Sequence, residues 1–233
     1  MSEKVKAQEA FKVAKAEGRK ILTEYESKKI LRTYGIPVTM AEIATNADEA
    51  GAAASKVGFP VVLKIHSPDI THKSDVGGVK VNLKSSGEVK KAFNEIITNV
   101  KQHKPDAKIN GVLVQNMAPS GREIIVGVTK DRQFGSLVMF GLGGIFVEVL
   151  KDVSFRLPPI SKKEAMNMMA EIKGYPILKG VRGTEPADLD AVADVIAKTS
   201  RMVMDLPEIS ELDMNPIFVY NKGLMVVDAR IVM

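Results

Sequence analysis

The chain of 233 residues contains no cysteine and no tryptophan. The absence of cysteine excludes a disulfide scaffold, a cysteine-ligated zinc or iron–sulfur site, and a thiol nucleophile. Aromatic residues make up only 5% of the chain, which argues against a stacking platform for single-stranded nucleic acid. A cysteine-free composition fits a reducing compartment, so we expect a cytoplasmic location.

Long apolar runs and the two commonest nucleotide-binding motifs are also lacking. No stretch approaches the roughly 18 apolar residues of a membrane span, so no membrane partner is expected. There is no Walker A motif, and no G-x-G-x-x-G follows a strand. The net charge of +5, from 33 basic and 28 acidic residues, is spread along the chain. It suits anionic small molecules such as nucleotides and phosphates.

The apolar spacing predicts helices and strands that mix without strict β-α-β alternation, which favours an α+β fold over a Rossmann sheet. Helices are expected over 4–20 (an exposed arm), from 23, over 48–57 and 85–101, from 161, and over 186–204. Three of them open on a serine or threonine that is followed three residues later by a glutamate, at 23–26, 85–88 and 161–164, which predicts a cap at each of these helix starts. Strands are expected over 38–43, 61–65, 79–83, 112–115, 123–128, 136–140, 211–219 and 224–231. The first three strands after residue 111 are expected to be successive antiparallel neighbours.

Lys64 stands inside the apolar stretch 61–65. On the solvated outer face of a sheet, such a lysine would simply meet water. Turned toward a ligand instead, its ammonium group would suit a phosphate. The residue types at this position leave both interpretations open.

A polar loop follows this stretch and ends in two adjacent glycines, Gly77 and Gly78. Glycines let the backbone approach a ligand closely, and they can expose amide N–H groups to anions. His72 in the same loop is either an ordinary exposed histidine or a nucleophile that carries a covalent intermediate.

Two strand ends carry polar residues that could meet a nucleotide. Gln115 and Met117 stand where a strand passes into a loop, and such a joint can offer backbone groups and a polar side chain to an adenine edge. Glu123 opens the next strand and could bond a ribose. Ordinary loop residues and solvent-facing strand residues would show the same pattern.

The last two strands carry the most specific late signal. Asp213 and Asn215 share one strand face by the period of two, and Asp228 lies on the neighbouring strand of the expected hairpin. Carboxylate and amide oxygens suit Mg²⁺, which takes few protein ligands together with waters and substrate phosphates. Each residue alone could be a polar residue near a turn, but the convergence of three oxygen ligands predicts a metal site.

The order of these motifs along the chain is more specific than any one of them. They are the segments 58–64, 67–79 (SPDITHKSDVGGV), 112–115, 121–123, 141–148 (GLGGIFVE), 151–158 and 213–216. In this order they resemble the ATP-grasp family, and within it the β subunits of ADP-forming acetate–CoA ligases, relatives of succinyl-CoA synthetase. The histidine in the second segment distinguishes this branch from succinyl-CoA synthetase.

The resemblance implies an ATP-grasp fold of two α+β subdomains with the nucleotide bound between them. We expect these subdomains over 23–110 and 111–233, behind a helical arm over 1–22. Mg²⁺ and ATP or ADP are the implied cofactors. The implied metal ligands are Asn215 and Asp228, with Asp213 beside them.

The resemblance also implies roles for the remaining candidates. Lys64 contacts the nucleotide phosphates, with Lys73, Gly77 and Gly78 in the mobile phosphate loop. The Gln115 side chain and the Met117 backbone face the adenine, and Glu123 faces the ribose side. His72 matches a second phosphate carrier, whereas Glu148 and Arg156 lie in family-like segments without an assigned role.

The implied reaction converts acyl-CoA, ADP and phosphate to acid, CoA and ATP through phosphohistidine carriers, with His72 passing the phosphoryl group to Mg·ADP. The first carrier, the CoA site and the acid site belong to a partner α subunit, so we expect a hetero-oligomer, α2β2 or larger. Two other functions stay open. One is a stand-alone ATP-grasp ligase that acts through an acyl phosphate, and the other is a non-catalytic nucleotide-binding module.

Overall fold

The structure, a computed structural model, describes residues 3–144, 147, 149–181 and 183–233. It divides into two compact units, each with its own hydrophobic core. One unit comprises Met1–Val38 together with Pro119–Met233, and the other comprises Thr39–Ala118. This grouping differs from the expected boundaries, because residues 23–38 lie with the C-terminal unit and residues 111–118 lie with the middle unit.

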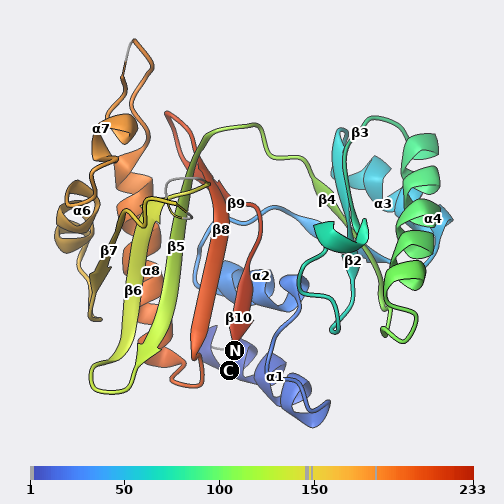
Figure 1. The fold of residues 1–233 in the computed structure, drawn as a ribbon, viewed down its shortest axis with the longest axis horizontal. Coiled ribbons are helices and arrows are strands. Elements are labelled where there is room, and N and C mark those ends of the chain that lie inside the picture. The colour runs from blue at the N-terminus through green and yellow to red at the C-terminus, as the bar shows by residue number, and fades with distance from the viewer. Residues whose placement is uncertain (1–2, 145–146, 148, 182) are drawn as a thin grey trace. The chain divides into compact units, whose positions relative to one another are not determined.

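The middle unit contains a four-stranded antiparallel sheet in the order β1-β4-β2-β3. Helices α3 and α4 pack together and contact strands of this sheet (Figure 1). Its elements are β1 (Ala41–Ala44), α3 (Ala47–Val57), β2 (Val61–His66), a 3-10 turn η1 (Ser74–Val76), β3 (Val79–Leu83), α4 (Ser86–His103) and β4 (Gly111–Asn116).

The other unit is built on a six-stranded antiparallel sheet in the order β10-β8-β5-β6-β7, with β9 also paired to β8 (Figure 1). Its helices are α1 (Glu3–Ala16), α2 (Glu24–Thr33), α6 (Lys162–Ala170), α7 (Tyr175–Leu178) and α8 (Leu189–Asp205). Its strands are β5 (Arg122–Asp131), β6 (Gly135–Leu142), β7 (Val153–Arg156), β8 (Glu211–Val219), β9 (Leu224–Val226) and β10 (Arg230–Val232).

Strand β4 is the main departure from the predicted strand arrangement. It was expected to precede β5 and β6 as an antiparallel neighbour, and this prediction is wrong. β4 pairs instead with β1 and β2, while β5 pairs with β6 and β8. A strand that is buried on both faces fits the centre of a sheet, and the apolar residues of β4 occupy that position between β1 and β2.

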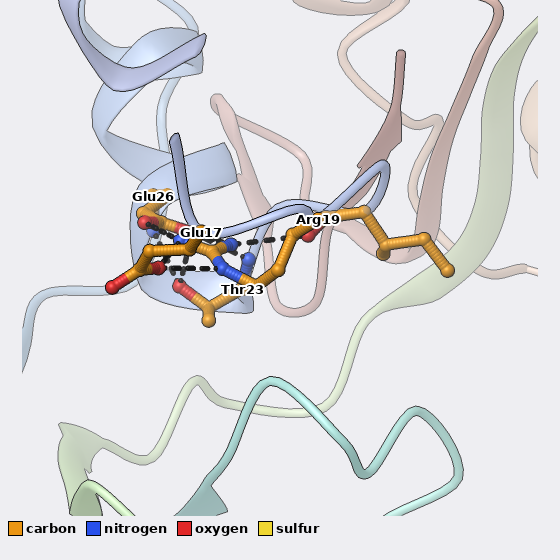
Figure 2. A network of polar contacts seen from close by, with 5 residues as sticks. Glu17, Arg19, Thr23 and Glu26 are labelled. Carbon is orange, nitrogen blue, oxygen red and sulfur yellow. Dashed lines mark hydrogen bonds and ion pairs between the residues drawn. The ribbon is translucent and has the colours of Figure 1, made fainter. Parts of the chain in front are cut away.

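The N-terminal helix is not the exposed arm that its composition predicts. Ala7, Phe11 and Ala14 follow one another at helical spacing and are buried in the core of the unit. Beyond this helix, Thr23 forms the predicted capping box with Glu26 at the start of α2. Figure 2 shows that Arg19 joins this cap. Its guanidinium donates to both carboxylate oxygens of Glu26, at 3.0 and 2.9 Å.

Among the described residues, no helix is both long enough and apolar enough to cross a membrane.

Candidate functional site

The two faces of the four-stranded sheet differ in what they carry. Val61, Leu63 and Ile65 of β2 point into the core with α3 and α4. Lys64 alternates with these residues and therefore lies on the opposite face. It is nevertheless only 6% exposed, so the solvent-facing interpretation of Lys64 is wrong.

Gln115 shares this second face with Lys64. The register pairs Val62 with Gln115 and Lys64 with Leu113, so Lys64 and Gln115 are diagonal neighbours across β2 and β4. Gln115 is 1% exposed, and its side-chain oxygen accepts a hydrogen bond from the Thr39 hydroxyl at 3.4 Å. A cationic and an amide side chain thus lie together on a buried face away from the helices of their own unit.

The adenine-side prediction for Met117 meets a specific constraint. The Met117 N–H donates to the Pro60 carbonyl at 3.0 Å and is therefore used within the unit. The Met117 residue is 37% exposed, and Phe59, beside Pro60, is 40% exposed. The Met117 N–H is therefore already used within the unit, and what this residue offers to a ligand in this structure is apolar surface.

The loop with the two glycines is held closely against β2. A Cβ on Gly78 would lie 2.7 Å from Ile65 Cγ2 and 2.8 Å from the Lys73 carbonyl oxygen, so only glycine fits there without movement. Gly77 has a φ of +64°, in the left-handed region that glycine tolerates. Its N–H donates to the Ser74 carbonyl, and the Gly78 N–H donates to the Lys73 carbonyl. Both donors are thus used within the loop, and the glycines here serve close packing and turn geometry.

His72 lies in the same loop, just before η1, and is exposed. Lys73 follows it and is half-buried. The loop returns to the sheet where the Ile65 N–H donates to the Gly78 carbonyl at 2.7 Å. The structure therefore places an exposed imidazole on a loop whose ends are fixed beside the strand that carries Lys64.

Glu123 and the glycine segment after β6 come together in the other unit. The Gly143 N–H donates to the Glu123 carbonyl at 2.8 Å, and a Cβ on Gly143 would lie 2.9 Å from Glu123 Cβ. A Cβ on Gly144 would lie 3.6 Å from a carboxylate oxygen of Glu123. Gly143 and Gly144 therefore pack directly beside Glu123, an exposed residue about 20 positions earlier in the sequence.

The predicted metal ligands gather around a β-bulge. Ile124 pairs with Ile217 and Val126 pairs with Met214, so Asn215 and Pro216 together oppose a single residue of β5. The strand predicted over 224–231 is broken at the same level, into β9 and β10. The Val227 N–H donates to the Pro216 carbonyl at 3.0 Å there, which places the segment that carries Asp228 beside the bulge.

Asp213 lies two residues before the bulge, opposite Gly127 on β5 and Arg230 on β10. Burial raises the pKa of the Asp213 carboxyl; Arg230 opposes this rise, whereas Asp228 and Glu211 add to it. Its Oδ1 atom is buried and has no hydrogen-bond partner among the described residues. A buried carboxylate oxygen without a donor, close to a second carboxylate, is the environment that a cation would satisfy.

The donor set fits Mg²⁺. Within the described ranges, no group of three or more acidic or histidine side chains is placed to hold a metal ion by itself, so an ion here would also need amide, water or phosphate oxygens. Two carboxylates and one amide, from Asp213, Asp228 and Asn215, match an ion that takes one or two carboxylates and completes its shell with waters and substrate phosphates.

Arg230, for which the sequence predicts no role, also lies beside Asp213. A cavity of about 290 Å³ opens on the sheet face that carries Asp213, and Gly127 and Arg230 also line it. Arg230 is exposed and lies directly across from Asp213 on β10. Only the pairing register reveals this position, because the two residues are 17 positions apart in the sequence.

The structure therefore brings the candidates together in two groups, one in each unit. Of the two residues without an assigned role, Arg156 forms an ion pair with Glu171, and Glu148 lies outside the described residues. The middle unit holds Lys64, His72, Lys73, Gly77, Gly78, Gln115 and Met117, and the other unit holds Glu123, Asp213, Asn215 and Asp228.

Comparison with known proteins gives matches over almost all of the chain. The ATP-grasp domain family matches residues 13–233. The β subunit of acetate–CoA ligase (ADP-forming) I from Pyrococcus furiosus is 52% identical over 233 residues, which is 100% of both chains. The longer acetate–CoA ligase (ADP-forming) I of Archaeoglobus fulgidus is 48% identical over 231 residues, which cover 99% of this chain and 33% of that protein.

A solved structure is also similar over nearly the whole chain. Acetyl-coenzyme A synthetase 1 of Ca. Korarchaeum cryptofilum, in complex with coenzyme A and Ca-AMPCP, matches with a TM-score of 0.95 and 51% identity, over 97% of this chain and 99% of that chain. The predicted α+β fold and the predicted resemblance to the ATP-grasp family are thereby confirmed. With a family match from residue 13 to the end and a 52% identical relative of equal length, the chain belongs to the ATP-grasp family and, within it, to the β subunits of ADP-forming acetate–CoA ligases.

Proposed function

We propose that this chain is the nucleotide-binding subunit of an ADP-forming acyl-CoA synthetase. With a partner, it converts acetyl-CoA or a similar acyl-CoA, ADP and phosphate to the acid, CoA and ATP. The observation that carries the proposal is the 52% identity over the full length of an acetate–CoA ligase β subunit. The buried pair of Lys64 and Gln115 supports it, because an ammonium group suits the phosphates of a nucleotide and an amide suits the edge of its base.

The phosphoryl group reaches ADP from His72 in this proposal. The bond between phosphorus and the imidazole nitrogen breaks, its electron pair stays on the nitrogen, and a β-phosphate oxygen of ADP forms the new bond. Such transfer depends on positioning and on offsetting the charge of the phosphoryl oxygens. Lys64 supplies fixed positive charge, and the loop from His72 to Gly78 carries the donor.

Mg²⁺, when it is bound, offsets charge on the phosphate oxygens of the nucleotide. Asn215 and Asp228 would hold it, with Asp213 beside them. A related structure of acetyl-coenzyme A synthetase 1 contains Mg-AMPPCP and a phosphohistidine segment that points towards the nucleotide-binding site. That observation belongs to the related protein and supports the metal and carrier roles proposed for this chain.

A partner subunit completes the reaction. The relatives of equal length are β subunits, and the Archaeoglobus fulgidus relative carries the matching region as one third of a longer chain. We infer a CoA-binding α subunit that forms the acyl phosphate and holds the first phosphohistidine. An α2β2 or larger assembly in the cytoplasm is the expected form.

Co-expression with a CoA-binding α-type subunit tests the proposal. The copurified complex should form ATP from acetyl-CoA, ADP and phosphate, and neither chain should do so alone. Activity of the isolated chain would indicate a stand-alone ATP-grasp ligase. Binding of ADP without turnover, even in the complex, would indicate a non-catalytic nucleotide-binding module.

A further inference from the structure

A buried ion pair in α2 lies against the segment that carries Asp228. The Lys28 ammonium is 2.7 Å from a carboxylate oxygen of Glu24, one helical turn earlier. The two side chains are 5% and 1% exposed. The same ammonium donates a second hydrogen bond, at 2.7 Å, to the Val227 carbonyl, which is 199 residues away in the sequence.

The bonded carbonyl belongs to the peptide bond that joins Val227 to Asp228. The N–H of Val227 is also fixed, because it donates to the Pro216 carbonyl at the bulge. On the other side, the Ala229 N–H donates to a carboxylate oxygen of Asp228 at 2.8 Å. Two hydrogen bonds therefore fix Val227, the residue before Asp228: its N–H donates to the Pro216 carbonyl, and its carbonyl accepts from Lys28.

Stability alone does not explain a buried ion pair at this place. Removing two charges from water is costly, and an apolar pair of similar volume often stabilises a fold equally well or better. A lysine that forms a short bond to one chosen carbonyl does what an apolar side chain cannot. It sets the orientation of one peptide plane, and thereby the direction in which the next side chain leaves the backbone.

We propose that Lys28, held by Glu24, is a positioning residue for the divalent-cation site: it fixes the Val227 carbonyl and so aims the Asp228 carboxylate at the cation. This inference rests on the proposed function, because it takes Asp228 as a metal ligand. Groups that orient metal ligands without touching the metal commonly change metal affinity by about 10–100-fold when they are removed.

The chain offers a matched control elsewhere in the same unit. Lys198 forms an ion pair with Asp194, four residues earlier, at 2.6 Å. It also donates to the Gly35 carbonyl at 2.7 Å. The contacts are those of Lys28, although this ion pair is partly exposed (34% and 33%) and the bonded carbonyl is not next to a candidate ligand. Lys198→Met thus removes the same kind of interaction without touching the Asp228 segment.

The test titrates the complete enzyme with Mn²⁺ as a spectroscopic probe of the cation site, and it also measures the Mg²⁺ concentration for half-maximal ATP formation and the melting temperature. The double variant Glu24→Leu/Lys28→Met should keep a melting temperature close to that of the wild type, because it replaces the ion pair with an apolar one. Its Mn²⁺ dissociation constant and its Mg²⁺ requirement should both rise about tenfold or more, while the KM for acetyl-CoA stays unchanged. Lys198→Met should leave the Mg²⁺ requirement as it is.

An unchanged Mg²⁺ requirement in a folded double variant would overturn the positioning role. If the leucine variant fails to fold, Glu24→Gln/Lys28→Met gives the same readout, since it also leaves no buried charge unpaired. A rescue arm uses Lys28→Arg, which keeps a donor for Val227 and should need less Mg²⁺ than either double variant. A wild-type enzyme that binds ADP without any dependence on Mg²⁺ would instead contradict the proposed function itself.

Discussion

Lys64 and Gln115 are diagonal neighbours on adjacent strands, on the face of the four-stranded sheet that lies away from α3 and α4. Both side chains are almost fully buried. A buried ammonium is costly unless opposite charge or hydrogen bonds offset the loss of water. The two side chains thus give this face a buried polar character that the apolar face against α3 and α4 does not have.

Lys64→Met should weaken ADP binding about tenfold or more, because it removes a point cation from the phosphates. Isothermal titration calorimetry with ADP in the presence of Mg²⁺ measures this effect. Lys80→Met is the control, since Lys80 on β3 forms its ion pair with Glu95 of α4. Equal affinity of Lys64→Met and the wild type would remove Lys64 from the site.

Gly78→Ala should disable the loop without unfolding the unit. The new Cβ would meet the Lys73 carbonyl and Ile65, both closer than 3.0 Å, so the loop must move away from β2. ATP formation by the complex should fall at least tenfold, with a melting temperature lowered by only a few degrees.

Gly87→Ala is the matched control for this loop variant. A Cβ there would have no neighbour closer than 4.0 Å, and the position lies in α4. Alanine loses less backbone entropy than glycine on entering a helix, by about 0.5–1 kcal/mol in a helix interior, and the gain in this first turn should be at most that large. The control should therefore be as active as the wild type and slightly more stable, and an equal loss in both variants would contradict the loop argument.

The helix starts were predictable because their signals lie within a few neighbouring residues. The capping boxes at Thr23 and Ser161 form as predicted. At Ser85 only half of the box forms, because the Glu88 carboxylate accepts from the Lys84 N–H instead. Such signals depend on residues three or four apart, and these are in contact in any helix.

Contacts between residues that are far apart along the chain could not be predicted from the sequence. Strand β4 joins β1 and β2, although its apolar pattern would equally suit a place beside β5. Lys28 bonds a carbonyl 199 residues away, and Arg230 meets Asp213 only through strand register. The candidate residues themselves were found from their order along the chain, whereas their geometry required the fold.

Asp213→Asn should lower the affinity for Mg²⁺ in the presence of ADP about tenfold. The amide keeps the shape of the side chain but removes a negative charge from the site where Oδ1 has no donor among the described residues. Titration with Mn²⁺ as a spectroscopic probe measures the affinity. Glu211→Gln on the same strand serves as control, and a similar loss in both would show a general field effect instead.

The contact between Arg19 and Glu26 should make stability depend on pH (Figure 2). Burial raises the pKa of Glu26, but the hydrogen bonds from Arg19 and Thr23 outweigh burial and leave this pKa below its ordinary value. A lowered carboxyl pKa adds stability above the unfolded pKa, and this stability is lost as the pH falls through the folded value.

Glu26→Gln should therefore cost on the order of 1–2 kcal/mol in the free energy of unfolding at pH 7. The difference from the wild type should shrink below about pH 4, near the ordinary pKa of glutamate. Urea unfolding at several pH values measures it. Glu17→Gln, at a more exposed partner of Arg19, should have almost no effect, and a pH-independent loss in Glu26→Gln would contradict the assignment.

The central claim is that His72 carries the phosphoryl group, and phosphate labelling tests it most directly. The complex is incubated with acetyl-CoA and labelled phosphate without ADP, and the label on each subunit is measured. We predict acid-labile label on this chain in the wild type, its release as ATP when Mg·ADP is added, and loss of both in His72→Ala. Normal labelling of this chain and normal ATP formation in His72→Ala would contradict the claim.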